Sequence, residues 1–228
     1  MKLSISMTRR ETLLGWIYLL ISLFVLPVAL YLINALLNDP LSDTEVNLAF
    51  IGLNFLAVGL ILRLFLTASA KAAANKPWRV LAYAAAGLAL YFLGSFVIGI
   101  VIVFVSADFS NVNDNAVMGL FQEHAALMAI FTVLLVPVAE ESLYRGLLFQ
   151  GFQRKSRLLA YCLSTFIFAG IHVVGYIGSA DLITLCLCFM QYLPAGITLA
   201  WAYEKADTIA APMLIHIMIN LIGTTAMR

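Results

Sequence analysis

Seven hydrophobic stretches, separated by short polar links, run along the chain. A helix that crosses the hydrocarbon core of a bilayer needs about 20 apolar residues. The pattern predicts an all-α, polytopic membrane helix bundle of about seven transmembrane helices, at residues 13–37, 47–70, 78–106, 122–149, 158–177, 182–203 and 208–226. Because no link is long enough to hold a soluble domain, we expect residues 1–228 to form a single integral membrane domain.

Lys and Arg gather at alternate ends of these stretches. They occur before the first stretch and beside the links that join the second to the third, the fourth to the fifth, and the sixth to the seventh. The other links, residues 38–47, 107–116 and 178–181, contain neither residue type. Since links rich in Lys and Arg tend to stay in the cytoplasm, we expect a multi-pass protein of the cell membrane with a cytoplasmic N-terminus and an outer C-terminus.

The composition supports this assignment and excludes other classes. Hydrophobic residues make up 63% of the chain and charged residues 11%, against about 45–50% and 25% in soluble domains. The net charge of +1 and the lack of a long basic run argue against a nucleic-acid partner. The three cysteines all fall inside hydrophobic stretches, so neither a disulfide framework nor a structural zinc site is expected.

A few polar side chains interrupt the later hydrophobic stretches, where a charge costs about 2.5–3.5 kcal/mol on insertion scales. They are Glu140, Glu141 and Arg145 in the fourth stretch, His172 in the fifth, and His216 and Asn220 in the seventh. Along an ideal helix from the nearest charged link, Glu140, His172 and Asn220 lie about 20–22 Å deep and His216 about 14 Å. We therefore expect these groups, from three helices, to share one layer of the membrane.

Spacing within the fourth stretch predicts how its charges are arranged. Glu141 and Arg145 are four residues apart, so they share a helix face and can pair. Glu140 is rotated by about 100° from Glu141 and points elsewhere. Pro137 precedes the acids and Gly146 follows the arginine, which predicts a kink or an interruption of the helix beside the site.

Hydrolysis is the chemistry that these residue types favour. A buried carboxylate beside a second acid is a suitable general base for water, and a neutral histidine can share its proton. An imidazole and a carboxamide on one helix face are suitable donors to an oxyanion. No serine or cysteine stands in an obvious nucleophile motif, although Ser142 and Ser164 stay open as alternatives. Taken singly, the Glu–Arg pair also fits a structural ion pair, and each histidine or asparagine fits a hydrogen bond between helices.

Three short motifs in this region resemble those of the CAAX protease and bacteriocin-processing (CPBP, or Abi) intramembrane proteases. In chain order they are Glu140-Glu141-x-x-x-Arg145, Phe168-x-x-x-His172 and His216-x-x-x-Asn220. The resemblance covers roughly residues 130–225, and the compact chain is more similar to the prokaryotic members. It divides the chain into three helices without a motif, residues 1–116, and a four-helix catalytic core, residues 117–228.

The resemblance also implies a role for each motif residue. Glu140 and His172 are expected to activate the attacking water, and His216 and Asn220 to stabilise the oxyanion. Glu141, Arg145 and Phe168 are expected to support the site.

Two mechanisms have been attached to this family. One needs no cofactor, and we favour it because His216 paired with Asn220 suits an oxyanion. The other holds zinc, for which Glu140, His172 and His216 are the available ligands.

The expected partners are membrane lipid and a peptide or lipidated protein substrate, and the sequence carries no indication of oligomeric state. Prokaryotic members are linked to peptide processing, to bacteriocin immunity and to scaffolding of other membrane proteins. A non-catalytic scaffold or immunity protein is therefore the main alternative to an enzyme. A proton-coupled transporter is a weaker one, because the chain shows no pair of related halves.

Overall fold

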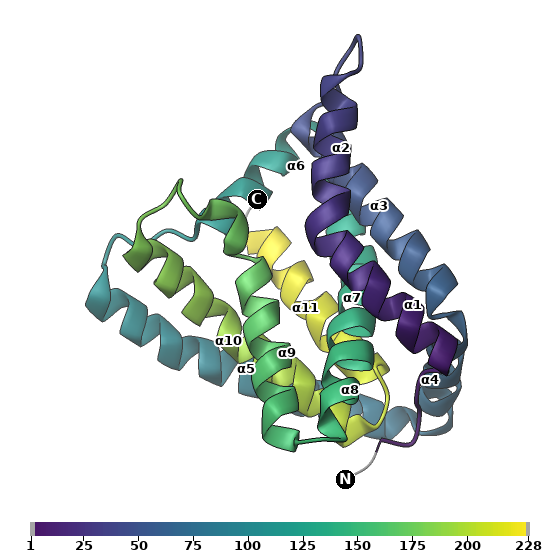
Figure 1. The fold of residues 1–228 in the computed structure, drawn as a ribbon. Helices are drawn as coiled ribbons and strands as arrows, with labels where there is room; N and C mark the ends of the chain where they lie inside the picture. Colours follow the sequence, from purple (N-terminus) through teal and green to yellow (C-terminus); the bar gives the residue numbers. More distant parts are fainter. Residues whose placement is uncertain (1–2, 227–228) are drawn as a thin grey trace.

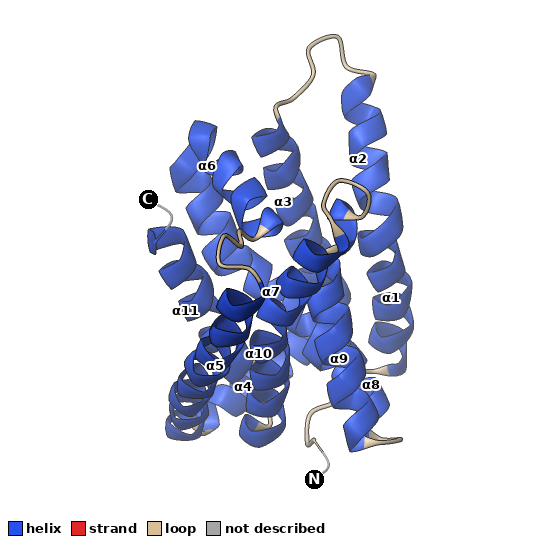
Figure 2. Ribbon diagram, turned by 90° about the vertical axis from the view of Figure 1, so that its left-hand side faces the viewer, coloured by secondary structure: helices blue, strands red, loops and turns tan. Residues whose placement is uncertain are grey.

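The structure, a computed structural model, describes residues 3–226 and is built of helices joined by short links (Figures 1 and 2). The first half contains α1 (Arg9–Leu20), α2 (Leu26–Ala35), α3 (Asp43–Ile61), α4 (Arg63–Asn75) and α5 (Pro77–Val105). The second half contains α6 (Val112–Ile130), α7 (Val136–Glu141), α8 (Gln150–Gln153), α9 (Arg157–Ile171), α10 (Leu182–Ala206) and α11 (Ala210–Ala226). Three π-helical segments, η1 (Ile21–Val25), η2 (Phe131–Leu135) and η3 (Ser142–Phe149), and a 3₁₀ turn, η4 (Val174–Tyr176), complete the described chain.

The predicted all-α bundle of a multi-pass membrane protein is confirmed. Within residues 3–226, five helical rods are long and apolar enough to cross a membrane, at Arg9–Ala35, Asp43–Ile61, Pro77–Val105, Val112–Gln153 and Leu182–Ala206. The other two predicted spans correspond to the shorter apolar helices α9 and α11, of 15 and 17 residues. Helix α10 packs against α5, α9 and α11, and α11 also packs against α5, α7 and η2.

Three predicted boundaries were wrong. Helix α6 begins at Val112, inside a predicted link, because Asn111 Oδ1 accepts from the amides of Asn113 and Asp114 and so caps the helix. The second predicted span continues to Asn75, after a break at Leu62. The fifth, predicted to reach residue 177, ends as an α-helix at Ile171.

The links with and without Lys and Arg lie at opposite ends of the bundle. At one end, Ser4 Oγ donates to Asp207 and the Arg79 guanidinium donates to the Lys205 carbonyl. At the other end, Asn111 binds Gln191. Helix α4 lies toward the lower end of Figure 1 and the α2–α3 link at the upper end. The separation has the form expected of a membrane protein, and the assignment of the Lys- and Arg-rich end to the cytoplasm stays a prediction.

Two of the π-helical segments precede a proline by the same spacing. Pro27 follows η1 and Pro137 follows η2, each as the second residue after the segment. Proline has no amide hydrogen and crowds the preceding turn, so a wider turn relieves the clash. The interruption that Pro137 predicted therefore takes the form of a π-turn. A third π-turn, η3, follows the two glutamates directly.

Glu11, which the sequence analysis did not single out, joins the starts of two helices. Its side chain accepts from the amide and hydroxyl of Thr8 at the start of α1. Its other oxygen accepts from the amides of Leu64 and Phe65, at 3.0 and 2.9 Å. These are first-turn amides of α4, which has no side-chain cap of its own. The break at Leu62 is thus stabilised by a carboxylate from another helix.

Replacing Glu11 by alanine is expected to destabilise the fold, because it leaves the Leu64 and Phe65 amides unsatisfied at about 1–3 kcal/mol each. The matched control is Glu45→Ala, since Glu45 forms the same type of capping box at α3 but, among the described residues, no hydrogen bond to a second helix. Its expected cost is about 1 kcal/mol. Thermal unfolding in detergent measures both variants, and equal losses would contradict the second capping role of Glu11.

Candidate active site

Glu141 lies at the centre of a fully buried charged cluster. Its Oε1 accepts from Arg145 Nη1 at 3.2 Å, and neither side chain is exposed. The same oxygen lies 2.8 Å from His216 Nδ1 on α11. The pairing of Glu141 with Arg145 was predicted from helical spacing and is confirmed. The contact with His216 was not predicted, because it depends on how α11 packs against α7.

The Arg145 guanidinium has further partners that make its complete burial tolerable. Its Nη2 donates to the carbonyl of Gly196 on α10, at 3.3 Å, and its Cζ lies 4.6 Å from the centre of the Phe168 ring. A side chain at Gly196 would meet Thr165 within 3 Å, so only glycine permits this approach of α10 to α9. Hydrogen bonds from Nη1 and Nη2 and a cation–π contact thus replace part of the lost hydration of the arginine, while Nε has no hydrogen-bond partner among the described residues.

Glu140 points away from Arg145, as its position on the helix predicted. Its Oε2 lies 4.0 Å from His216 Nε2. The two consecutive glutamates therefore face opposite nitrogens of one imidazole. The Glu140 side chain is 23% exposed, whereas Glu141 is wholly buried. Among the described residues, none forms a hydrogen bond with Glu140 Oε2. Glu141 Oε2 also lacks a hydrogen-bond partner among the described residues, so exposure distinguishes the two acids, and Glu140 is the one that a further group can reach.

Phe168 places both histidines around one ring. Its ring centre lies 4.9 Å from that of His172 and 5.9 Å from that of His216. This ring and the contact between Glu141 and His216 bring groups of α7, α9 and α11 together, and their shared depth in the membrane stays a prediction. In the part of the chain that the structure describes, no contact within 4.0 Å joins Glu140 to His172; Glu140 lies nearer to His216.

His172 occupies the end of α9 and is half-buried. Its Nδ1 lies 2.7 Å from the carbonyl oxygen of Phe168, one turn earlier. Since a carbonyl only accepts, Nδ1 carries the hydrogen of the neutral imidazole and Nε2 carries the lone pair. The ring stacks on Tyr192 of α10, with centres 4.2 Å apart and an interplanar angle of 24°. The motifs gave no signal for Tyr192.

Asn220 contacts η2, the π-helical segment that precedes Pro137. Its Nδ2 donates to the carbonyl of Thr132 at 2.8 Å. In η2 the Val136 amide bonds the Phe131 carbonyl, five residues back. The next amide in that register belongs to Pro137 and is missing, which leaves the Thr132 carbonyl without its helical donor. Asn220 supplies that donor, and one amide hydrogen remains for another acceptor.

Neither serine alternative has the setting of a nucleophile. The Ser142 hydroxyl donates to the carbonyl of Val138 at 2.6 Å, and the Ser164 hydroxyl donates to the carbonyl of Tyr144 at 3.2 Å. Both side chains are fully buried. No histidine or carboxylate that might act as a base binds either hydroxyl among residues 3–226.

The three residues of the zinc alternative do not form a ligand set in this arrangement. Within the described residues, no group of three or more His, Cys, Asp or Glu side chains converges closely enough to hold a metal ion. The Nδ1 atoms of His216 and His172 already have partners, Glu141 and a carbonyl, so only their Nε2 atoms would be available to a metal. The chemistry below is therefore derived without a metal.

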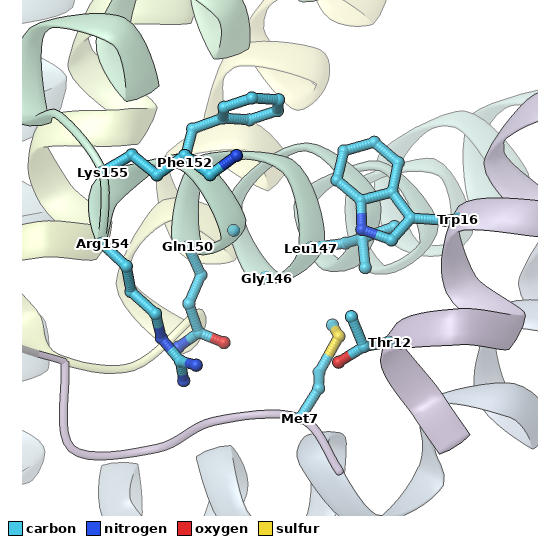
Figure 3. Close-up of a pocket in the computed structure, with 10 residues that line it drawn as sticks. Met7, Thr12, Trp16, Gly146, Leu147, Gln150, Phe152, Arg154 and Lys155 are labelled. Carbon is cyan, nitrogen blue, oxygen red and sulfur yellow. The ribbon is translucent and has the colours of Figure 1, made fainter. Parts of the chain in front are cut away.

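A separate pocket of about 310 Å³ opens on another side of η3 (Figure 3). Thr12 and Trp16 of α1 line it on one side, and Gln150 and Arg154 on the other. None of the candidate catalytic residues is among its lining residues. We do not assign this pocket to the site.

The fold and the buried cluster together define a helical multi-pass membrane protein with a polar site between α7, α9 and α11. Residues 122–222 match the family described as type II CAAX prenyl endopeptidase Rce1-like. The match contains all three motifs and confirms that this region of the chain is Rce1-like, consistent with the resemblance to the CPBP proteases. Comparison with curated proteins and with solved structures gave no match.

Proposed function

We propose that this protein is an intramembrane endopeptidase that hydrolyses a peptide bond of a membrane-associated or lipidated peptide. The observation that carries the proposal is the difference in contacts and exposure between Glu140 and Glu141. Glu141 binds both Arg145 and His216 and is wholly buried, whereas Glu140 is 23% exposed and forms no hydrogen bond through Oε2 with any described residue. The family match over residues 122–222 supports the reaction class.

In the proposed reaction Glu140 is the general base. It accepts a proton from water as the water oxygen attacks the peptide carbonyl carbon, and that carbonyl oxygen becomes the oxyanion. The tetrahedral intermediate then breaks its carbon–nitrogen bond, and the proton passes to the leaving amine. His172, through the lone pair of Nε2, is the second acceptor that we assign to water activation. Its alanine variant is expected to lose cleavage as well.

His216 and Asn220 are the proposed donors to the oxyanion. Asn220 has one amide hydrogen left after binding the Thr132 carbonyl. In its doubly protonated form His216 donates from Nε2 as well as from Nδ1, and Nε2 is the nitrogen that faces Glu140. Donors fixed in a site shielded from water stabilise developing charge better than mobile solvent does. The contact of His216 with Glu141 and the hydrogen bond of Asn220 to the Thr132 carbonyl would hold these two donors in place.

Purified protein incubated with a panel of lipidated and unlipidated peptides tests the proposal, with products identified by mass spectrometry. We expect cleavage at a defined bond of at least one membrane-associated peptide. A scaffold or immunity protein would leave every peptide of the panel intact under conditions in which the fold is retained.

Chelation provides a further prediction. Because the site residues do not converge as metal ligands, we expect EDTA or 1,10-phenanthroline to leave the cleavage rate unchanged. The measurement is the rate before and after chelation, with a zinc protease in parallel as the positive control. Loss of activity that returns on addition of Zn²⁺ would contradict the metal-free mechanism.

A further inference from the structure

His172 stands at a position where the backbone alone cannot fix a side chain. Helix α9 ends at Ile171, and His172 is its C-terminal cap. The chain leaves the helix at Val173, which has φ of −122°. Backbone conformation limits a side chain to a few rotamers, but it does not fix the plane of an imidazole ring. The direction of the imidazole must therefore come from contacts of the side chain.

Two aromatic rings and one carbonyl supply these contacts. The Phe168 carbonyl accepts a hydrogen bond from Nδ1, and the Phe168 ring packs beside the imidazole. Tyr192 covers a face of the imidazole in a near-parallel stack. Among the described residues, none forms a hydrogen bond with Nε2. The surroundings of His172 thus fix its ring plane and one nitrogen, and they leave the other nitrogen free.

Tyr192 is in turn held by the start of α6. Its hydroxyl donates to Asp114 Oδ1 at 2.9 Å and accepts from Asn113 Nδ2, also at 2.9 Å. Asn113 Oδ1 accepts from the Tyr176 hydroxyl at 3.4 Å. The donor and acceptor roles of the Tyr192 hydroxyl are therefore both assigned, and one of its partners is a carboxylate.

We propose that Tyr192, anchored by Asp114 and Asn113, is a positioning residue that sets the ring plane and the tautomer of His172. The proposal rests on the proposed function for its consequence in catalysis. If the stack is lost, the imidazole can turn about its side-chain bonds, so that Nδ1 leaves the Phe168 carbonyl and either nitrogen can carry the hydrogen. The lone pair of Nε2 would then no longer be presented in a single direction.

The effect on catalysis is tested with Tyr192→Leu and Tyr192→Phe. Tyr192→Leu removes the stack, and we expect kcat to fall about 10²-fold with little change in KM, as for a misplaced catalytic group. Tyr192→Phe keeps the stack and loses two hydrogen bonds, so a fall of no more than about tenfold is expected. The control is Tyr31→Leu, because Tyr31 is 72% exposed on α2 and far from α9 in sequence.

A spectroscopic readout separates this proposal from the function on which it rests. ¹⁵N shifts of histidine-labelled protein report the tautomer, and the His172→Gln variant identifies the His172 signal. We expect the Nδ1–H tautomer in the wild type, in Tyr192→Phe and in Tyr31→Leu, and a mixture of tautomers in Tyr192→Leu. A wild-type protein without peptidase activity would refute the proposed function, and the tautomer would still decide the role of Tyr192. An unchanged tautomer in a folded Tyr192→Leu variant overturns the positioning role.

Discussion

Replacing Glu140 by glutamine is expected to reduce peptide cleavage by about 10²–10⁴-fold while the protein remains folded. Glutamine has nearly the same shape as glutamate but accepts no proton from water at neutral pH. Because Glu140 forms no hydrogen bond through Oε2, the substitution removes no buried bond of that atom. The measurement is the initial rate of product formation, together with the thermal unfolding midpoint.

Glu123→Gln is the matched control for this variant. Glu123 is an exposed glutamate of α6 whose carboxylate binds the Ser42 hydroxyl at the other end of the bundle. The Glu123→Gln substitution removes one negative charge, as Glu140→Gln does, and we expect the cleavage rate of this variant to equal that of the wild type. Wild-type rates in purified Glu140→Gln protein would sink the assignment of Glu140 as the general base.

Replacing Arg145 by methionine is expected to cost about 3–5 kcal/mol of stability, because it leaves Glu141 as a buried charge without its cation. Both side chains are fully buried and lie 3.2 Å apart. Activity should fall as well, since Glu141 also holds His216. Thermal and chemical unfolding in detergent, with the cleavage rate of the same preparation, measure the two effects.

A double substitution separates pairing from the loss of a single side chain. In Glu141→Gln/Arg145→Met neither charge is left alone, so its loss of stability should be smaller than the sum of the two single losses. Arg157→Met is the control, because Arg157 pairs with Glu204 but its side chain is 61% exposed. We expect it to cost far less stability than Arg145→Met, because solvent screens an exposed ion pair. Additive losses at positions 141 and 145 would contradict direct coupling.

Local spacing predicted the features of the site that belong to one helix. The four-residue separation of Glu141 and Arg145 predicted their pairing, and the rotation of Glu140 predicted that it faces another group. Pro137 predicted an interruption beside the acids. These features follow from the geometry of a single helix, which the residue pattern largely determines.

Contacts between helices were beyond the reach of the same reasoning. The sequence placed His216 in the layer of the acids but gave no sign that Glu141 would bind its Nδ1. Tyr192 carries no motif, and its position against His172 depends on how α10 packs against α9. Glu11 carries no motif either, and its second role exists only because α4 begins beside it. The catalytic roles of Glu140, His172, His216 and Asn220 stay predictions.

The location of the Glu141–Arg145 pair on one rod bears on how the chain enters the bilayer during synthesis. Because both charges lie in the same segment, that segment carries its own counterion and need not wait for α11. A lone charge would add about 2.5–3.5 kcal/mol to the insertion of the segment, whereas a pair formed beforehand is neutral overall. His216 then joins a preassembled ion pair when the last segment arrives, so biogenesis can proceed in the order in which the ribosome delivers the helices.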